Sequence, residues 1–306
     1  MSKDLKIVFM GTPHFAVTCL KTLVEEELNI VAVITAVDKP AGRGKKLKAS
    51  PVKEYALEQG LRVLQPSNLK SPDFIDELKQ LEVDLFVVVA FRMLPEVVWA
   101  MPPMGTINLH ASLLPNYRGA APINWAIING EKETGVTTFF IEKEIDTGKI
   151  IHQDRVRILE EMTAGELHDE LALVGSRLLC KTITAIAKEE AESYVQAYDS
   201  EHMKKAPKIF KEDCRINWDS MGLDIHNFIR GLSPFPSAWT QLDDEKASLL
   251  KIARATFIEE RHEERPGSIR ISKRTFEVAC KDGWISILEL IPQGKGKMNV
   301  QAFLNG

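Results

Sequence analysis

Fully apolar segments that alternate with helical patterns constrain the fold of this 306-residue chain more than any other feature. Residues 6–10 (KIVFM), 30–36 (IVAVITA) and 85–90 (LFVVVA) are short runs rich in strand-forming residues, and residues 106–110 continue the series. A strand that is apolar on both sides is buried on both, and strands that alternate with helices form a parallel sheet covered on both faces. We therefore predict an α/β protein with a Rossmann-like, doubly wound, mainly parallel sheet.

Helix start signals fall where this fold needs them. Ser50 precedes Pro51, which suits the first position of a helix, and Gly60 follows that helix. Thr163 is followed three residues later by Glu166, which is a capping box at the start of a helix predicted over residues 164–187.

The sequence changes character near residue 209. Short β-rich segments separated by turn residues follow, and they predict a small, OB-like antiparallel barrel. From Glu201 to the end of the chain, 17 basic side chains slightly outnumber 15 acidic ones. We therefore divide the chain into a first domain at 1–189, a linker at 190–208 and a C-terminal β-barrel at 209–306.

Composition excludes several classes of protein. The N-terminal segment is too short and charged for a secretory signal, and no apolar run approaches the roughly 20 residues that span a membrane. The spacing of the four cysteines fits neither a zinc site nor a disulfide scaffold, and no metal site is visible. A dinucleotide site is not expected, because Gly11-Thr12-Pro13 lacks the G-x-G-x-x-G pattern. We expect a cytoplasmic protein.

A concentrated basic segment stands out in a chain whose net charge is −4. Residues 39–53 contain six basic residues and no acidic one. Such a segment indicates either a contact with a polyanion or a solvated loop, and charge alone does not decide between them.

Two polar residues share one face of the strand predicted at 106–110. Asn108 and His110 are two residues apart, so both point to the same side, where an unpaired polar group would be costly to bury. Together with Asp146, they supply an amide, an imidazole and a carboxylate, which suit acyl-type transfer. No G-x-S-x-G nucleophile motif occurs, which favours direct attack by an amine. The residues alone also allow His110 to be a core histidine and Asp146 a turn residue.

Residues 106–122 (TINLHASLLPNYRGAAP) and the IDTG motif around Asp146 resemble the signature of the 10-formyltetrahydrofolate-dependent formyltransferases. Three segments are similar to the members of that family that formylate methionine on initiator tRNA: FMGTPHFA, DKPAGRGKKLKASPVK, and the C-terminal FKEDCRINW with LSPFPSAW. The resemblance covers nearly the whole chain. It implies a catalytic trio of Asn108, His110 and Asp146, and 10-formyltetrahydrofolate as formyl donor without a metal.

The resemblance also implies two binding sets. The folate would contact Ser112, Leu113, Leu114, Pro115, Ala90, Phe91, Arg92, Met93 and Leu94, with residues 141–146 completing the pteridine wall. The charged initiator tRNA would contact Arg43, Lys45, Lys46 and Lys48, and the C-terminal barrel at 209–306 would be a further tRNA-contacting domain. Phe91-Arg92 departs from the Tyr-Gly common in the family, so the path of that loop is an open question. We expect a monomer.

Three other functions share part of this pattern. A formyltransferase that acts on an amino sugar nucleotide or a ribonucleotide amine would keep the trio but would not need the basic segment or the barrel. A formyltetrahydrofolate hydrolase would use water in place of the amine and would not need a polyanion site. A non-catalytic RNA-binding module would have no reason to carry a complete trio.

Overall fold

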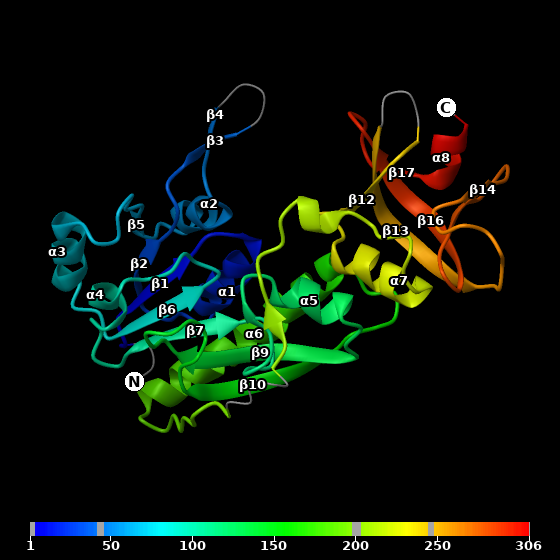
Figure 1. The fold of residues 1–306 in the computed structure, drawn as a ribbon. Coiled ribbons are helices and arrows are strands. Elements are labelled where there is room, and N and C mark those ends of the chain that lie inside the picture. Colours follow the sequence, from blue (N-terminus) through cyan, green and yellow to red (C-terminus); the bar gives the residue numbers. More distant parts are fainter. Residues whose placement is uncertain (1–3, 42–45, 198–202, 244–247, 306) are drawn as a thin grey trace. The chain divides into compact units, whose positions relative to one another are not determined.

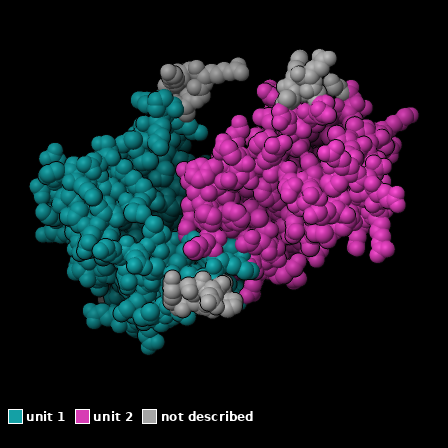
Figure 2. Space-filling model, viewed as in Figure 1, with its two compact units in different colours: residues 1–118, 135–156, 169–204 teal, residues 119–134, 157–168, 205–306 magenta. Residues whose placement is uncertain are grey.

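The computed structural model describes residues 4–41, 46–197, 203–243 and 248–305 of the chain. They form two compact units. The first comprises residues 1–118, 135–156 and 169–204, and the second comprises residues 119–134, 157–168 and 205–306 (Figure 2). Each unit combines several segments of the chain, whereas the domains predicted from the sequence are continuous ranges. The predicted domain division therefore stays a prediction.

The first unit is built on a seven-stranded sheet with the order β10-β9-β7-β6-β1-β2-β5 (Figure 1). The strands are β1 (Ile7–Gly11), β2 (Ile30–Ile34), β5 (Val63–Leu64), β6 (Leu85–Val89), β7 (Thr106–His110), β9 (Glu133–Phe140) and β10 (Ile150–Arg157). Neighbours from β7 to β5 are parallel, whereas β9 runs antiparallel to β7. The predicted Rossmann-like, mainly parallel sheet is therefore confirmed.

Helices flank this sheet because its central strands are apolar on both faces. Every residue of β1 is buried, and successive residues point to opposite sides of the sheet. Val8 and Met10 pack in one core cluster with Phe74 and Leu78 of α3. The helices are α1 (His14–Glu25), α2 (Pro51–Glu58), α3 (Pro72–Gln80), α4 (Glu96–Trp99) and most of α6 (Ala164–Ala187).

The predicted caps are present. The Ser50 hydroxyl accepts a hydrogen bond from the Lys53 backbone N–H at 3.1 Å and so caps α2. At the start of α6, the Glu166 carboxylate accepts from the Thr163 N–H at 2.7 Å, and the Thr163 hydroxyl accepts from the Glu166 N–H at 3.3 Å. This reciprocal pair is the predicted capping box.

The second unit contains an antiparallel sheet with the order β12-β13-β16-β15-β14, and β17 pairs with β16. Its strands are β12 (Ala238–Gln241), β13 (Leu249–Glu259), β14 (Ile269–Ile271), β15 (Phe276–Ala279), β16 (Gly283–Pro292) and β17 (Met298–Asn299). This sheet confirms the predicted C-terminal β-domain and fits a small barrel. The sequence analysis missed its helical elements, namely α7 (Gly222–Gly231), α8 (Val300–Leu304) and the 3₁₀ turn Glu212–Cys214, as well as α5 (Pro122–Ile128).

Two short pairs of strands complete the described structure. The basic segment forms a hairpin of β3 (Lys39–Ala41) and β4 (Lys46–Lys48) where the sequence predicted only a loop. The other pair is β8 (Arg118–Gly119) and β11 (Lys205–Ala206), and β11 falls inside the predicted linker. Among the described residues, no helix combines the length and apolar character that a membrane crossing requires.

Candidate active site

Strand β7 carries Asn108 and His110 on one face near its carboxyl end. Asn108 is half-buried and His110 is buried. Within the described residues, the Asn108 side chain makes no hydrogen bond, and it retains access to solvent. Its amide N–H groups are therefore available to a ligand.

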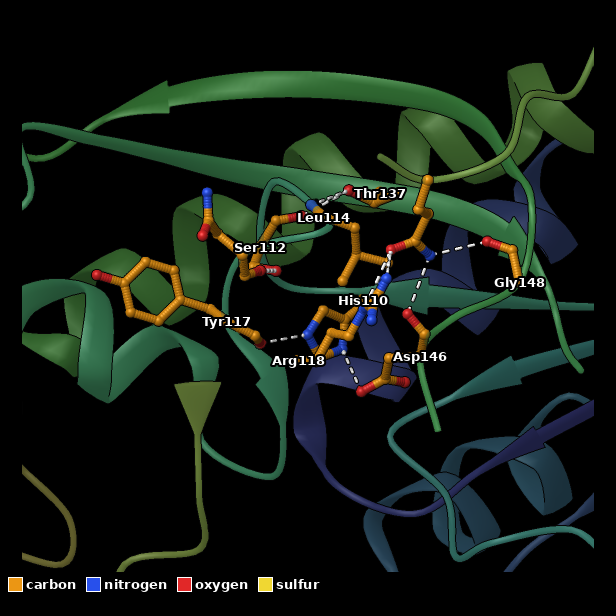
Figure 3. Close-up of polar contacts among 10 residues, drawn as sticks. His110, Ser112, Leu114, Tyr117, Arg118, Thr137, Asp146 and Gly148 are labelled. Carbon is orange, nitrogen blue, oxygen red and sulfur yellow. Dashed lines mark hydrogen bonds and ion pairs between the residues drawn. The ribbon is translucent and has the colours of Figure 1, made fainter. Parts of the chain in front are cut away.

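His110 lies between a backbone carbonyl and a carboxylate (Figure 3). Its Nε2 is 2.8 Å from the Tyr117 carbonyl oxygen, which can only accept, so Nε2 carries a proton. Its Nδ1 is 3.9 Å from Asp146 Oδ2, a distance too long for a direct hydrogen bond but short enough for electrostatic attraction. The two side chains are 8% and 14% exposed, so solvent screens this attraction only in part. A proton on Nδ1 would face a negative charge.

The loop that carries Asp146 has a constrained backbone. Asp146 has a φ of 56°, in the left-handed region that Asp tolerates better than most residues. Thr147 Oγ1 donates to the Glu144 carbonyl at 3.0 Å. A Cβ added at Gly148 would lie 1.7 Å from the Phe140 carbonyl oxygen, so no larger residue fits there. The Asp-Thr-Gly motif therefore serves both as a tight turn and as the support of the carboxylate that faces His110.

The predicted folate segment 112–115 is held by its own hydrogen bonds. The Ser112 hydroxyl is fully buried and donates to the Asn116 carbonyl at 2.7 Å. Thr137 Oγ1 donates to the Ser112 carbonyl at 2.6 Å, and Gln153 Nε2 donates to the Leu114 carbonyl at 3.0 Å. The Ser112 side chain therefore fixes the loop, which leaves the partly exposed Leu113 and Pro115 as the surfaces that a ligand can reach.

The second predicted folate segment, 90–94, has mixed exposure. Ala90 has a φ of 47°, Met93 is 73% exposed, and Leu94 is buried in the core cluster with α3. The Arg92 guanidinium donates to the carbonyls of Pro66 and Ser67 and lies 5.7 Å from the centre of the Phe91 ring. Arg92 thus ties this loop to the segment after β5, which gives a definite path to the stretch that departs from the family pattern.

A pocket of about 430 Å³ opens at the start of β7. It includes Ile141 and Glu142 from the predicted pteridine wall but none of residues 90–94. Sequence reasoning missed the rest of its lining, which is Trp99, Ala100, Pro102, Pro103, Gly105, Thr106, Phe140, Lys149 and Ser193. The pocket lies at the amino end of β7, whereas His110 is the last residue of that strand, so the pocket is not part of the site around His110 and Asp146.

The predicted tRNA-binding residues are only partly described. Arg43 and Lys45 lie outside the described residues, as does the side chain of Lys46, whereas Lys48 is exposed on β4. The base of the hairpin is fixed by Asp38, whose carboxylate accepts from Gln65 Nε2 at 2.8 Å and from Lys53 Nζ at 2.6 Å. The hydrogen bond from Gln65, followed by that from Lys53, lowers the pKa of Asp38 below its usual value.

One residue near the trio was missed altogether. Gln196 lies in the predicted linker, yet it is only 6% exposed and contacts the loop of Asp146. No sequence motif singles out a lone glutamine in a polar segment, so only the fold brings it to the site.

Comparison with known proteins agrees with this geometry. Residues 5–183 match the family model described as formyl transferase, and residues 208–306 match that of the formyl transferase C-terminal domain. A methionyl-tRNA formyltransferase from Flavobacterium johnsoniae is 51% identical over 99% of this chain and 96% of its own length. Another from Phocaeicola vulgatus is 53% identical, again over 99% of this chain and 96% of its own length.

A solved structure shares the fold. It is the N-formyltransferase of Helicobacter canadensis in complex with folinic acid and dTDP-3-aminofucose, with a TM-score of 0.66 and 23% identity over 96% of this chain and all of its own. The matches to two domain models, which together cover most of the chain, and the identity of about half to relatives over nearly their full length establish the family. The chain belongs to the formyl transferase family, within its methionyl-tRNA formyltransferase group.

Proposed function

We propose that this protein transfers the formyl group of 10-formyltetrahydrofolate to the amino group of methionine on initiator tRNA, for translation initiation. The observation that carries the proposal is the arrangement of His110 between the Tyr117 carbonyl and the Asp146 carboxylate, on the strand that also carries an available Asn108 amide. The chain is about half identical to methionyl-tRNA formyltransferases over nearly its full length, which supports methionine-charged tRNA as the acceptor.

The reaction moves one acyl group between two nitrogens. The methionine amine attacks the formyl carbon, a C–N bond forms, and the carbonyl oxygen becomes a tetrahedral oxyanion. The bond from that carbon to folate nitrogen N10 then breaks, the amine loses a proton and N10 gains one. In this proposal the Asn108 amide donates to the oxyanion, which it stabilises more than the ground-state carbonyl.

His110 and Asp146 act on charge and protons. Because Nε2 donates to the Tyr117 carbonyl, the imidazole nitrogen that can exchange a proton is Nδ1, which lies next to Asp146. The carboxylate stabilises a proton on Nδ1 and orients the ring. The separation of 3.9 Å also accommodates a bridging water, through which a proton can pass.

The folate is proposed to lie against the loops 90–94, 112–115 and 141–146. The exposed Met93 and the partly exposed Leu113 and Pro115 offer apolar surface to a flat ring, and the loop carbonyls and amides can bind its polar edge. The related sugar N-formyltransferase structure was determined with folinic acid, which supports a folate donor in this fold.

The tRNA is proposed to contact the basic hairpin through Arg43, Lys45, Lys46 and Lys48. Lysine and arginine side chains neutralise phosphates and release counterions, which makes binding depend steeply on salt. A hairpin of this charge gives no advantage to an enzyme whose acceptor is a small amine, so it favours a nucleic-acid acceptor. We also propose that the protein is a monomer and acts in the cytoplasm. Light scattering of the purified chain would test its oligomeric state.

The test is a competition among acceptors. Formyl transfer from 10-formyltetrahydrofolate is measured with methionine-charged initiator tRNA, uncharged tRNA, free methionine and an amino sugar nucleotide. Transfer to the charged tRNA alone is the expected result. Transfer to a small amine would leave the hairpin without a role, and release of formate without any acceptor would indicate a hydrolase.

A further inference from the structure

A buried glutamine outside the predicted trio joins the loop of Asp146 to Arg118. Gln196 is 6% exposed, and its Nε2 donates to the Asp146 carbonyl at 2.9 Å and to the Gly148 carbonyl at 2.8 Å. Both N–H donors of the Gln196 amide are thus used on the loop that carries the Asp146 carboxylate.

The oxygen of the same side-chain amide also has two hydrogen-bond partners. Gln196 Oε1 accepts from Arg118 Nη2 at 2.6 Å and from Arg118 Nε at 3.2 Å. A primary amide has two donors and two acceptor sites, so Gln196 has its full set of partners. A buried polar group that is fully satisfied restricts the geometry of everything it contacts.

Arg118 is the next residue after Tyr117, whose carbonyl oxygen is the hydrogen-bond partner of His110. The Tyr117 carbonyl accepts from His110 Nε2 at 2.8 Å, while the next side chain in the sequence, Arg118, contacts Gln196. Tyr117 therefore contacts His110 directly, and Arg118 is connected to the loop of Asp146 through Gln196. Asp146 has a left-handed φ of 56°, which Asp tolerates better than most residues, and the two hydrogen bonds from Gln196 to this loop help to hold it.

We propose that Gln196 is a positioning residue for formyl transfer, which holds the Asp146 carboxylate opposite His110 by joining the Asp146–Gly148 backbone to Arg118. This inference rests on the proposed function of the trio. Gln196 touches neither His110 nor the Asp146 carboxylate in the hydrogen bonds described, so it acts through the loop and not on the substrate.

The substitutions separate the two ends of the amide. Gln196→Glu keeps an acceptor for Arg118 but places a carboxylate against two carbonyl oxygens, whereas Gln196→Met removes all four hydrogen bonds. Gln153→Met is the matched control, because Gln153 is a part-buried glutamine that holds the Leu114 carbonyl and the Thr137 hydroxyl instead of the Asp146 loop.

The first measurement is single-turnover formyl transfer at saturating folate and charged tRNA, in the full chain and in an Asp146→Asn background. Both Gln196 variants should slow the parent reaction on the order of 10- to 100-fold, because a shift of about 1 Å in a reacting group can have that effect. In the Asp146→Asn background they should have almost no further effect, whereas any effect of Gln153→Met should persist there. An equal loss from Gln196→Met in both backgrounds would overturn the proposal.

The second measurement does not depend on turnover. Histidine-selective ¹⁵N NMR reports the environment of His110 Nδ1, with the signal assigned by its loss in His110→Gln. Gln196→Glu and Asp146→Asn should move this signal in the same direction, and Gln153→Met should leave it in place. If Gln196 only stabilises the fold, its variants will lower the melting temperature while the His110 signal stays unchanged, and the proposal fails. If the parent chain transfers no formyl group but the His110 signal responds as expected, the proposed function fails and the positioning role of Gln196 stands.

Discussion

The proposed catalytic cluster, which comprises His110, Asp146, Tyr117, Arg118 and Gln196, and the basic hairpin β3–β4 are built in opposite ways. In the cluster, the side chains are at least partly buried, and contacts at defined distances join His110 to the Tyr117 carbonyl and Gln196 to Arg118 and to the Asp146 carbonyl. In the described part of the hairpin, Lys39 and Lys48 are exposed and Leu47 is 70% exposed, and the side-chain contacts gather at its base.

This difference suits what each region is proposed to recognise. Transfer of a formyl group needs atoms fixed within a fraction of an ångström, since misplacement reduces the rate steeply. A polyanion is attracted by charge over a longer range and in many orientations, so exposed lysines suffice. The two regions should therefore respond differently to substitution: the cluster through the rate of the chemical step, the hairpin through the apparent affinity for tRNA.

The largest effect is expected at His110. His110→Ala should lower the single-turnover rate on the order of 10²- to 10⁴-fold, because it removes the group that exchanges the proton. Binding of charged tRNA, measured by filter retention, should stay within about threefold of the parent, since the hairpin is unchanged. A matching loss of tRNA binding would mean that the two regions are not separable.

The next effect is expected at Asn108. Asn108→Ala should lower the rate roughly 10²- to 10³-fold at saturating substrates, as the loss of one oxyanion donor does elsewhere. Asn29→Ala, at an exposed asparagine, is the matched control and should react at the parent rate. Unchanged single-turnover kinetics in Asn108→Ala would contradict the role assigned to its amide.

A smaller effect of another kind is expected in the hairpin. Arg43→Ala and Lys48→Glu should each raise the KM for charged tRNA roughly 3- to 10-fold and reduce its salt dependence, while the KM for folate and the saturated rate stay constant. An equal rise in both KM values would argue against a specific tRNA contact.

The smallest effect is expected at the base of the hairpin. The folded-state pKa of Asp38 is lowered by its hydrogen bonds to Gln65 and Lys53, so the stability they add is present above the unfolded pKa of about 3.9 and is lost as the pH falls through the folded value. Asp38→Asn should therefore lower the melting temperature by a few degrees at most at pH 7, because Asp38 is partly exposed. The difference should shrink below about pH 4, and a difference that is constant with pH would show that charge is not its cause.

Much of this architecture is predictable from local sequence. The strands of the parallel sheet and the helix at residues 164–187 follow from apolar runs and from the Thr163–Glu166 capping box. That Asn108 and His110 share one face of a strand is predictable from their spacing. The catalytic trio with Asp146 comes from the family resemblance and stays a prediction. Contacts between distant segments are not predictable in this way: Gln196 reaches Asp146 across 50 residues, and the sequence near it is an ordinary polar stretch.

The same distinction explains the missed elements. Strands β3 and β4 consist largely of lysine, proline and alanine, which are poor strand formers, so their pairing depends on the antiparallel partner and not on local preference. Helix α7 was missed because it contains Gly222 and Gly231 within a stretch otherwise taken as β-rich.

The central claim is that the rate of the chemical step and the affinity for tRNA depend on different regions of the protein. Varying the salt concentration tests this claim most directly. Formyl transfer to methionine-charged initiator tRNA is measured at several salt concentrations, and the KM for tRNA and the saturated single-turnover rate are determined at each. We predict that the KM for tRNA rises steeply with salt while the saturated rate stays constant, because binding of tRNA depends on phosphate neutralisation and the chemical step does not. A saturated rate that falls in parallel with the affinity would contradict this account.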